Sequence, residues 1–306
     1  MTALDQLRFL FVTGKGGVGK TTICAALARH FADRGRRVLL AVSGAEERFT
    51  NLLGGGPIRE TISELSPGLS AVLLKPEVAF REYGLLVLKS ERLTNALFDN
   101  KYVQGFFKGA PGLKEWAMLG KAWYHASETL EGGRPRFDVV LFDAPATGHA
   151  LDMLRVPKVI IEVSPPGVLR SDAQRAWDFF RDPRQSGVVV ATLPEEMPTN
   201  ETVELVTAVR GELGLPVAAL AVNGVVQELF DAAGRAELAK LPVSESPAED
   251  PAERALESAV RRALRERVQS ESLVRLRELG APELRLPWIA GGVDSPAALS
   301  RLASCF

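Results

Sequence analysis

Five short runs of consecutive apolar and β-branched residues are spaced along the chain, and we expect each to be a β-strand. They are Arg8–Thr13, Arg37–Val42, Val139–Phe142, Gly187–Thr192 and Val217–Val222. Apolar residues are nearly continuous within each run, which is typical of parallel strands that are covered on both faces. Segments with helical spacing separate several of the runs: Thr21–Asp33, Asp172–Arg181 and Glu201–Leu213. This alternation predicts an α/β fold with an open, mostly parallel sheet and helices on both faces.

The longest interval between predicted strands, residues 43–135, places most of its apolar residues at helical spacing. Glycine and proline break it into helix-like pieces, which are Glu77–Leu88, Glu91–Phe107 and Leu113–Glu131. We interpret the interval as a mainly helical insertion subdomain within a single domain of residues 1–306, and as the natural place for partner specificity. Its bulky aromatic residues favour core packing over a client-binding groove; they are Phe98, Phe106, Phe107, Trp116, Trp123 and Tyr124.

Later in the chain, residues 241–253 are rich in proline, serine and acidic residues, and this composition predicts a surface linker. The linker leads into a charged helical stretch, Ala255–Leu279. Glutamate and arginine recur there at three- and four-residue spacings, which is typical of a solvated helix face rather than a binding site.

The chain has 37 basic and 38 acidic residues, a net charge of -1, and 46% hydrophobic residues. The hydrophobic fraction allows a large core, and the balanced charge provides no field that would attract nucleic acid or an anionic membrane. No signal-peptide pattern and no run of about 18 apolar residues occurs, so we expect a cytoplasmic protein without stable membrane insertion. The two cysteines, Cys24 and Cys305, are too few for a disulfide framework or a tetrahedral metal site.

A glycine-rich loop, VTGKGGVGKTT at residues 12–22, follows the first predicted strand directly and opens the first predicted helix. Glycines let the backbone turn its N–H groups toward a phosphate, and the helix N-terminus adds a favourable dipole. Lys20 is expected to pair with the β- and γ-phosphate oxygens, and the Thr21 hydroxyl to ligate Mg²⁺. The loop thus predicts ATP and magnesium as cofactors. Its expected nucleotide contacts are Gly14, Gly16, Gly17, Val18, Gly19, Lys20, Thr21 and Thr22.

A second element of the predicted site is Asp143, which ends the apolar strand in the sequence FDVVLFDAPATGH. The carboxyl ends of parallel strands meet at one edge of a sheet, so this carboxylate is expected near the glycine-rich loop. There it would share Mg²⁺ with Thr21 and contribute to catalysis.

Two stretches of the chain resemble the ArsA/Get family of dimeric P-loop ATPases. Lys15 directly follows Gly14, the first glycine of the loop, and KGGVGKT resembles the signature of the wider MinD/ParA/ArsA/Get class, in which this lysine is the signature lysine. The sequence DAPATGHALDMLRVP resembles the switch II sequence of the ArsA/Get family, whose TGH extension MinD and ParA proteins lack. The resemblance implies a dimer in which Lys15 acts catalytically on the partner's nucleotide, while the Gly148 N–H contacts the γ-phosphate.

Segments near the end of the sheet extend the resemblance to the base of the nucleotide. LAVNGVV resembles the adenine-reading strand of the family and implies that Asn223 binds adenine, for which an amide offers both a donor and an acceptor. LPWIAGG resembles the loop that packs on adenine and implies contacts from Pro287 and Trp288. Two further matches, PGLKE at 111–115 and VVVATLPEEMPTNET at 188–202, extend the resemblance over nearly the whole chain.

The chain departs from the family at switch I. Gly44 stands where the family has the aspartate that positions the attacking water, and losing such a base typically lowers the rate by about a hundredfold or more. Glu46 or Glu47 is the alternative source of a carboxylate. The C-x-x-C motif of the tail-anchored-protein targeting branch and the cysteine triad of arsenite-stimulated pumps are absent, so we expect no zinc or arsenite site.

Three functional hypotheses follow from this sequence. The leading one is an ATP-hydrolysing dimer, homo- or heteromeric, that couples nucleotide state to the binding of a partner protein. The alternative is a hydrolysis-deficient nucleotide-binding subunit that works in a heterodimer with an active paralogue, and Gly44 motivates it. A partitioning ATPase that positions cargo on DNA or a membrane is disfavoured by the balanced charge and by a short C-terminal segment without amphipathic character.

Overall fold

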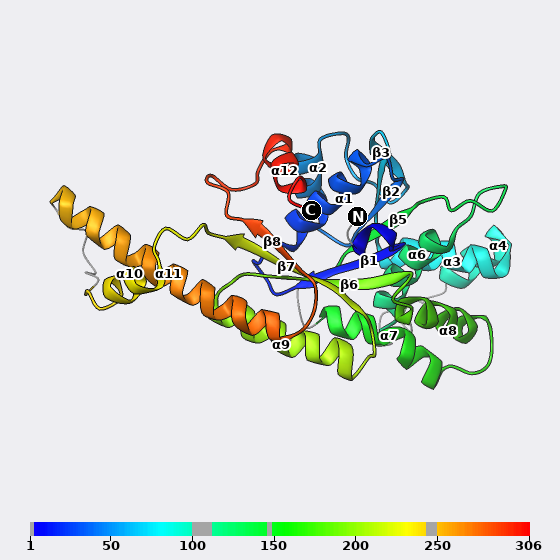
Figure 1. Ribbon diagram of the computed structural model, residues 1–306. Coiled ribbons are helices and arrows are strands. Elements are labelled where there is room, and N and C mark those ends of the chain that lie inside the picture. The colour runs from blue at the N-terminus through cyan, green and yellow to red at the C-terminus, as the bar shows by residue number, and fades with distance from the viewer. Residues whose placement is uncertain (1–2, 100–111, 146–148, 243–249) are drawn as a thin grey trace.

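The fold is built on one eight-stranded sheet, seen in a computed structural model that describes residues 3–99, 112–145, 149–242 and 250–306 (Figure 1). The strand order is β3-β4-β2-β5-β1-β6-β7-β8. Every neighbouring pair is parallel except β3 and β4, which are antiparallel. The strands are β1 (Phe9–Gly14), β2 (Val38–Val42), β3 (Ser63–Ser66), β4 (Leu69–Leu73), β5 (Val139–Asp143), β6 (Ser186–Thr192), β7 (Val217–Val225) and β8 (Glu283–Pro287).

Helices cover both faces of this sheet, because successive strand residues point to opposite sides. Phe9, Phe11 and Phe142 point to one face and belong to a core formed with α6 (Leu113–Ser127), α7 (His149–Val163), α8 (Val168–Arg181) and α9 (Glu196–Gly211). Leu10 and Val12 point to the other face, whose core includes α1 (Lys20–Asp33), α2 (Glu46–Leu53) and α12 (Pro296–Ala303). The predicted α/β architecture, with helices on both faces, is confirmed.

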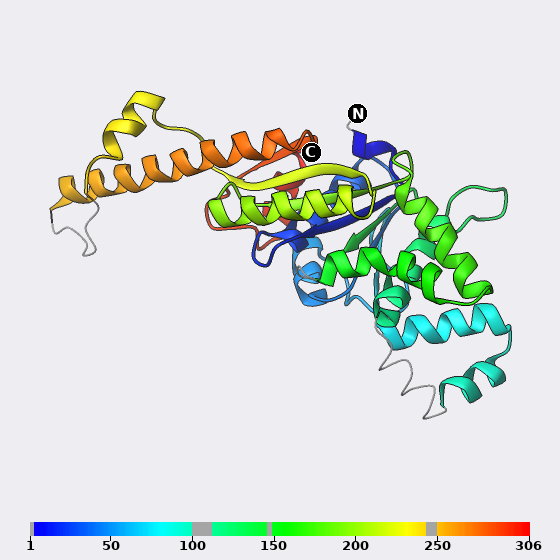
Figure 2. The ribbon, with the colours of Figure 1, turned by 90° about the horizontal axis from the view of Figure 1, so that it is seen from below.

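The remaining helices lie at the two ends of the molecule. Figure 2 shows α3 (Pro76–Leu88) and α4 (Glu91–Phe98) at one end, and α10 (Ala232–Leu238) and α11 (Pro251–Glu278) projecting from the other. A short 3-10 helix, η1 (Ala3–Gln6), precedes β1. The carboxyl ends of the parallel strands point toward the end that carries α10 and α11 (Figure 1), so the loops after β1 and β5 open on that side.

Two edge regions differ from the sequence-based prediction. The interval 43–135 contains a hairpin, β3–β4, that extends the main sheet beside β2, in addition to helices α2, α3, α4 and α6. Helical spacing was the wrong criterion for residues 63–73, because two strands of four and five residues are too short to show a period. Strand β8 was also missed, since charged Glu283 and Arg285 interrupt its apolar residues at the opposite edge.

Two helix boundaries differ as well. Helix α7 begins at His149, inside the segment that resembles switch II, and it contains Pro157. Helix α11 begins at Pro251, so the last residues of the predicted linker 241–253 are helical, while residues 243–249 lie outside the described residues. Asp250 caps α11 by accepting hydrogen bonds from the backbone N–H groups of Ala252 and Glu253.

Candidate nucleotide site

The glycine-rich loop runs from the end of β1 to the start of α1, and two of its glycines are packed tightly. Gly14 has φ 148°, and a Cβ there would lie 2.2 Å from the Ala191 backbone oxygen of β6. Gly19 caps α1 in the left-handed region with φ 93°, and a Cβ there would lie 2.5 Å from Asn223 Nδ2. Gly16, by contrast, is exposed and has no atom within 4 Å of the position of a Cβ. The two ends of the loop are therefore fixed against the sheet, while its middle faces open space.

Lys20 is the first residue of α1, and its side chain turns back over the loop. Its Nζ donates a hydrogen bond to the Lys15 backbone oxygen at 2.9 Å. Burial lowers the pKa of Lys20, and the nearby Asp143 carboxylate partly opposes that shift. The ammonium group is thus held above the loop backbone, where a phosphate oxygen would replace the carbonyl as its partner.

Asp143 is the last residue of β5 and lies between the two strands that flank it. Its register partners are Val12 of β1 and Val42 of β2. Thr21 Oγ1 donates a hydrogen bond to Asp143 Oδ2 at 3.2 Å, so the expected pair of magnesium-binding residues is in contact. Ser43 Oγ, from the segment after β2, donates to the Asp143 backbone oxygen at 2.8 Å.

The Asp143 carboxylate is buried, which is unusual for a group that can carry a charge. The residue is 5% exposed, and its Oδ1 is buried without a hydrogen-bond partner in the described part of the chain. Burial raises the pKa of Asp143 to about 7, despite opposing contributions from Thr21 and Lys20. A buried carboxylate oxygen with an open coordination position, next to a threonine hydroxyl, is the hard-oxygen donor set that Mg²⁺ prefers. The residues present therefore fit a magnesium ion.

The expected adenine contacts lie on the two strands at one edge of the sheet. Asn223 of β7 donates from Nδ2 to the Val18 backbone oxygen at 3.0 Å, which ties the glycine-rich loop to β7. Pro287 ends β8 in register with Val225, and the Trp288 N–H donates to the Val225 oxygen at 2.8 Å. Trp288 is 52% exposed, and the Arg265 guanidinium of α11 lies 5.7 Å from the centroid of its ring. The expected base contacts and the glycine-rich loop thus lie at the same end of the sheet.

Lys15 points away from the glycine-rich loop toward α9. Its Nζ forms an ion pair with a Glu201 carboxylate oxygen, and the two side chains are 49% and 25% exposed. Sequence reasoning did not anticipate this partner. Glu201 lies within the family-like segment 188–202, but nothing in that segment indicates a contact with Lys15, which is far away in the sequence. The ion pair places the expected cross-subunit lysine at the molecular surface.

One contact near the loop was also missed from the sequence. Arg48 of α2 donates from Nη2 to Thr22 Oγ1 at 2.9 Å, and so connects the segment after β2 to the loop helix. Gly44 has no atom within 4 Å of the position of a Cβ, so the structure leaves room for a side chain there. The expected γ-phosphate contact, Gly148, lies outside the described residues.

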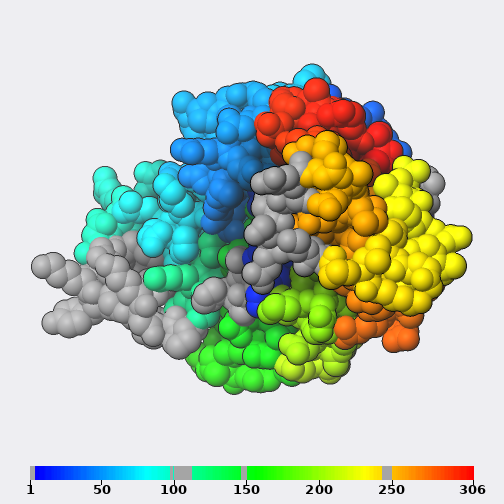
Figure 3. Space-filling view, turned by 90° about the vertical axis from the view of Figure 1, so that its left-hand side faces the viewer, coloured from blue at the N-terminus to red at the C-terminus, as the bar shows by residue number. Residues whose placement is uncertain are grey.

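Figure 3 looks onto the face toward which the parallel strands end. The dark-blue N-terminal part of the chain is visible near its centre. Helices α2 and α12 lie above it, and the yellow and orange α10–α11 segment lies to one side.

The chain is similar to known ATPases along most of its length. A family model described as anion-transporting ATPase matches residues 7–164, just over half of the chain. ATPase BagA of Mycobacterium tuberculosis is 27% identical over 310 residues, with 95% of this chain and 90% of that protein covered. The arsenical pump-driving ATPase of Acidiphilium multivorum is 30% identical over 244 residues, which cover 72% of this chain and 40% of the pump ATPase. A Paramecium tetraurelia protein, ATPase ASNA1 homolog 2, is 27% identical over 162 residues, with 51% of this chain and 46% of that protein covered.

Two kinds of feature are absent from the described residues. None of the described helices is long and apolar enough to cross a membrane. The same residues contain no group of three or more His, Cys, Asp or Glu side chains arranged to hold a metal ion. Cys24 is buried in α1, and Cys305 is exposed near the C-terminus.

Proposed function

This chain belongs to the anion-transporting ATPase family and is an ATPase, and we propose that it works as a dimeric switch that couples its nucleotide state to the binding of a partner protein. The observation that carries the site assignment is the contact between Thr21 and Asp143 directly beneath the glycine-rich loop. This contact brings together a hydroxyl and a carboxylate from segments 122 residues apart, at the point where a P-loop ATPase binds its metal and phosphates.

The residues of the loop have distinct roles in this proposal. Backbone N–H groups of Gly16, Gly17 and Gly19 surround the β-phosphate, and the N-terminus of α1 favours its negative charge. Lys20 exchanges its bond to the Lys15 oxygen for the β- and γ-phosphate oxygens. Asn223 selects the base, while Pro287 and Trp288 pack against it.

Thr21 and Asp143 hold Mg²⁺ in this proposal, and the ion, when bound, neutralises charge on the β- and γ-phosphates. Asp143 Oδ1 supplies the free buried oxygen, either directly or through a water. The raised pKa of Asp143 means that metal binding must compete with a proton near neutral pH. The residue therefore links metal affinity to pH.

Dimer formation supplies the catalytic lysine in this proposal. Lys15 lies at the surface in contact with Glu201, so it can turn toward a second subunit without unfolding the loop. Reaching the partner's γ-phosphate, it would stabilise transition-state charge as an arginine finger does. Gly148 N–H contacts the γ-phosphate in the same state, and α7, which follows it, carries the signal toward α6 and α8.

Those helices adjoin α3, so this part of the molecule is where we place the binding of a client protein. The proposed setting is cytoplasmic, with no role for nucleic acid, zinc or arsenite. The positions of the two cysteines support the proposal that arsenite has no role, since Cys24 is buried in α1 and Cys305 lies near the chain end.

One observation favours a second function, that of a hydrolysis-deficient nucleotide-binding subunit. Gly44 stands where the family has a carboxylate that positions the attacking water. Glu46 begins α2 and Glu47 follows it, so either carboxylate would have to turn back toward the nucleotide to replace the missing group. In this alternative the chain binds ATP without hydrolysing it efficiently, and an active paralogue completes the dimer.

The proposal is tested by measuring steady-state Mg-ATP turnover over a wide range of protein concentration. Specific activity that rises with concentration supports a catalytic homodimer. Tight ATP binding without turnover supports the hydrolysis-deficient alternative. Calorimetry of Lys20→Ala provides the matched control, because unchanged ATP affinity in that variant would contradict the assignment of the glycine-rich loop.

A further inference from the structure

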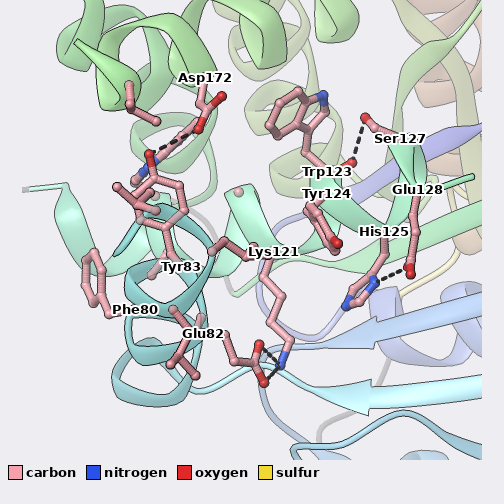
Figure 4. Close-up of a pocket in the computed structure, with 18 of the residues that line it drawn as sticks. Phe80, Glu82, Tyr83, Lys121, Trp123, Tyr124, His125, Ser127, Glu128 and Asp172 are labelled. Atoms are coloured by element: carbon pink, nitrogen blue, oxygen red, sulfur yellow. Dashed lines mark hydrogen bonds and ion pairs between the residues drawn. The ribbon is translucent and has the colours of Figure 1, made fainter. Parts of the chain in front are cut away.

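A cavity of about 1000 Å³ lies between helices α3, α6 and α8, away from the glycine-rich loop (Figure 4). We call it the α3–α6–α8 cavity. Its apolar lining includes the aromatic rings of Phe80, Trp116 and Trp123, which are 7%, 3% and 8% exposed. Tyr124, also in the lining, is 40% exposed. The volume is at the upper end of the range for small-molecule sites, which are typically apolar with a few placed polar groups.

Polar pairs mark the boundary of this cavity. Tyr83 of α3 donates a hydrogen bond to Asp172 Oδ2 of α8 at 3.1 Å. Lys121 of α6, largely buried, contacts Glu82 of α3 at 2.8 Å and also donates to the Glu60 backbone oxygen at 3.2 Å. Figure 4 shows these two pairs on different sides of the space. They join the helices around the cavity and define its shape.

The Tyr83–Asp172 hydrogen bond bears on the size of the occupant. It connects α3 directly to α8, the two helices that flank α6. An α-helix with its side chains is about 10 Å across, and inserting one between α3 and α8 would require that bond to break. A compact molecule can enter without separating the two helices. The structure therefore favours a small molecule over a protein helix.

The charges of the lining bear on the chemistry of the occupant. The described lining residues include four acidic and four basic side chains. Each acidic one contacts a basic partner, in the pairs Glu60–Lys75, Glu82–Lys121, Glu128–Arg136 and Asp172–Arg175. A charged ligand inside the cavity would have to displace one of these partners or lose its own hydration without compensation. Lys89, the basic lining residue that has no acidic partner in the described part of the chain, is exposed, so an anion paired with it would stay in contact with solvent. An uncharged ligand has neither cost.

His125 supplies one polar group that can face such a ligand. Its Nδ1 lies 3.1 Å from Glu128 Oε2, and a carboxylate can only accept a hydrogen bond, so Nδ1 carries the proton. Burial lowers the pKa of His125, so the ring is neutral near pH 7 and Nε2 is an acceptor. In Figure 4 the second ring nitrogen points away from Glu128, and His125 is one of the residues that line the cavity. Among the described residues, Nε2 has no hydrogen-bond partner.

We propose that the α3–α6–α8 cavity binds an uncharged, mainly apolar small molecule that donates one hydroxyl hydrogen bond to His125 Nε2. Aromatic rings and the methylene groups of the lining hold the apolar body, and the histidine selects a hydroxyl donor. The site does not depend on ATP hydrolysis, so failure of this proposal would leave the proposed function unaffected.

The experiment compares two probes by calorimetry without nucleotide, namely 2-naphthol and 2-methoxynaphthalene. The methyl ether has the same ring system but no hydroxyl donor. We expect 2-naphthol to bind about three- to tenfold more tightly, which corresponds to one net hydrogen bond. In His125→Phe the two probes should bind equally, because the acceptor is gone while Glu128 keeps its contact with Arg136. Equal affinity of the two probes for the unmodified protein would overturn the role of His125.

Gly120 provides the variant that locates the binding. It lines the cavity from α6, and a Cβ added there would lie at an ordinary 3.5 Å from the Trp116 ring. Gly120→Leu fills the cavity and improves helix propensity, so we expect a folded protein that binds 2-naphthol at least tenfold more weakly. Gly120→Ala is the matched control and should bind nearly normally.

Three results would reject the proposal. One is the absence of 2-naphthol binding up to its solubility. Another is unchanged binding in a Gly120→Leu variant whose circular dichroism is normal. The third is a leucine-rich helical peptide that displaces 2-naphthol and binds more tightly than it does, which would assign the cavity to a protein client instead.

Discussion

Lys15 and Glu201 form an ion pair within one subunit, between the glycine-rich loop and the first half of α9. The proposed catalytic role of Lys15 requires contact with another subunit's nucleotide. In that proposal, the ion pair competes with dimer formation for the same ammonium group. Because both side chains are partly exposed, the pair contributes at most about 1 kcal/mol.

Replacing Glu201 by Gln is expected to strengthen ATP-dependent dimerisation by up to about fivefold, because Lys15 no longer has to leave a carboxylate. Analytical ultracentrifugation with Mg-ATP measures the effect. Glu204→Gln is the control, since Glu204 is an exposed carboxylate on the same helix. Weaker dimerisation in Glu201→Gln would mean that Glu201 itself contacts the partner.

Replacing Lys15 by Ala is expected to leave the affinity for ATP nearly unchanged and to weaken ATP-dependent dimerisation. The reason is that Lys15 contributes its backbone oxygen to Lys20, while its side chain points to α9. Calorimetry of ATP binding and sedimentation with Mg-ATP separate the two effects. A sedimentation profile identical to that of the unmodified protein would reject the cross-subunit role.

Asp143 is expected to make both metal binding and stability depend on pH. Its pKa is raised to about 7 in the folded state, so between about pH 4 and pH 7 the folded chain binds more protons than the unfolded chain. The contribution of this group to the free energy of unfolding therefore falls as pH rises through that range and levels off above pH 7. Mg²⁺ competes with the proton, so Mg-dependent ATP affinity should rise over the same range.

Asp143→Asn tests both consequences in a single variant. At pH 8 without ligand, we expect it to melt higher than the unmodified chain by at least about 3 °C, because a buried charge is removed. Mg-dependent strengthening of ATP binding should be lost at every pH. A lower melting temperature at pH 8 would contradict the conclusion that burying the charged Asp143 carboxylate destabilises the folded chain.

The glycine-rich loop is expected to respond very differently to alanine at two positions. Gly14→Ala places a methyl group against the Ala191 backbone at a positive φ, and we expect it to lower the free energy of unfolding by at least about 2 kcal/mol. Gly16→Ala adds the same methyl group in open space and should be nearly neutral for folding. Urea denaturation of the two variants makes the comparison. Equal stability of the two variants would indicate that Gly14 does not pack closely against the Ala191 backbone.

Gly44→Asp tests whether the missing carboxylate limits hydrolysis. The position has room for a side chain and follows Ser43, which already contacts Asp143. If water positioning is the deficiency, we expect kcat for ATP to rise by about tenfold or more, with little change in ATP affinity. Gly44→Asn is the control of similar size without the charge. An unchanged kcat in Gly44→Asp would show that another group already orients the water.

The sequence by itself determined where the central strands of the sheet and the glycine-rich loop lie along the chain. Buried parallel strands such as β1, β5 and β6 are continuous apolar runs, so their location is encoded locally. The glycine-rich loop is also local, since its backbone conformations and its lysine and threonine lie within a few residues of one another. Asp143 could be placed beside Thr21 because parallel strands end at the same edge of a sheet.

Only the tertiary structure decided the partners that are distant in sequence. The pairing of Lys15 with Glu201 and of Thr22 with Arg48 depends on which helices meet, and no short-range pattern records it. The same holds for the edge strands, which are too short or too polar to show a period, and for the cavity that Tyr83 and Asp172 help to enclose. Local patterns specify elements and their chemistry, whereas packing selects the contacts between them.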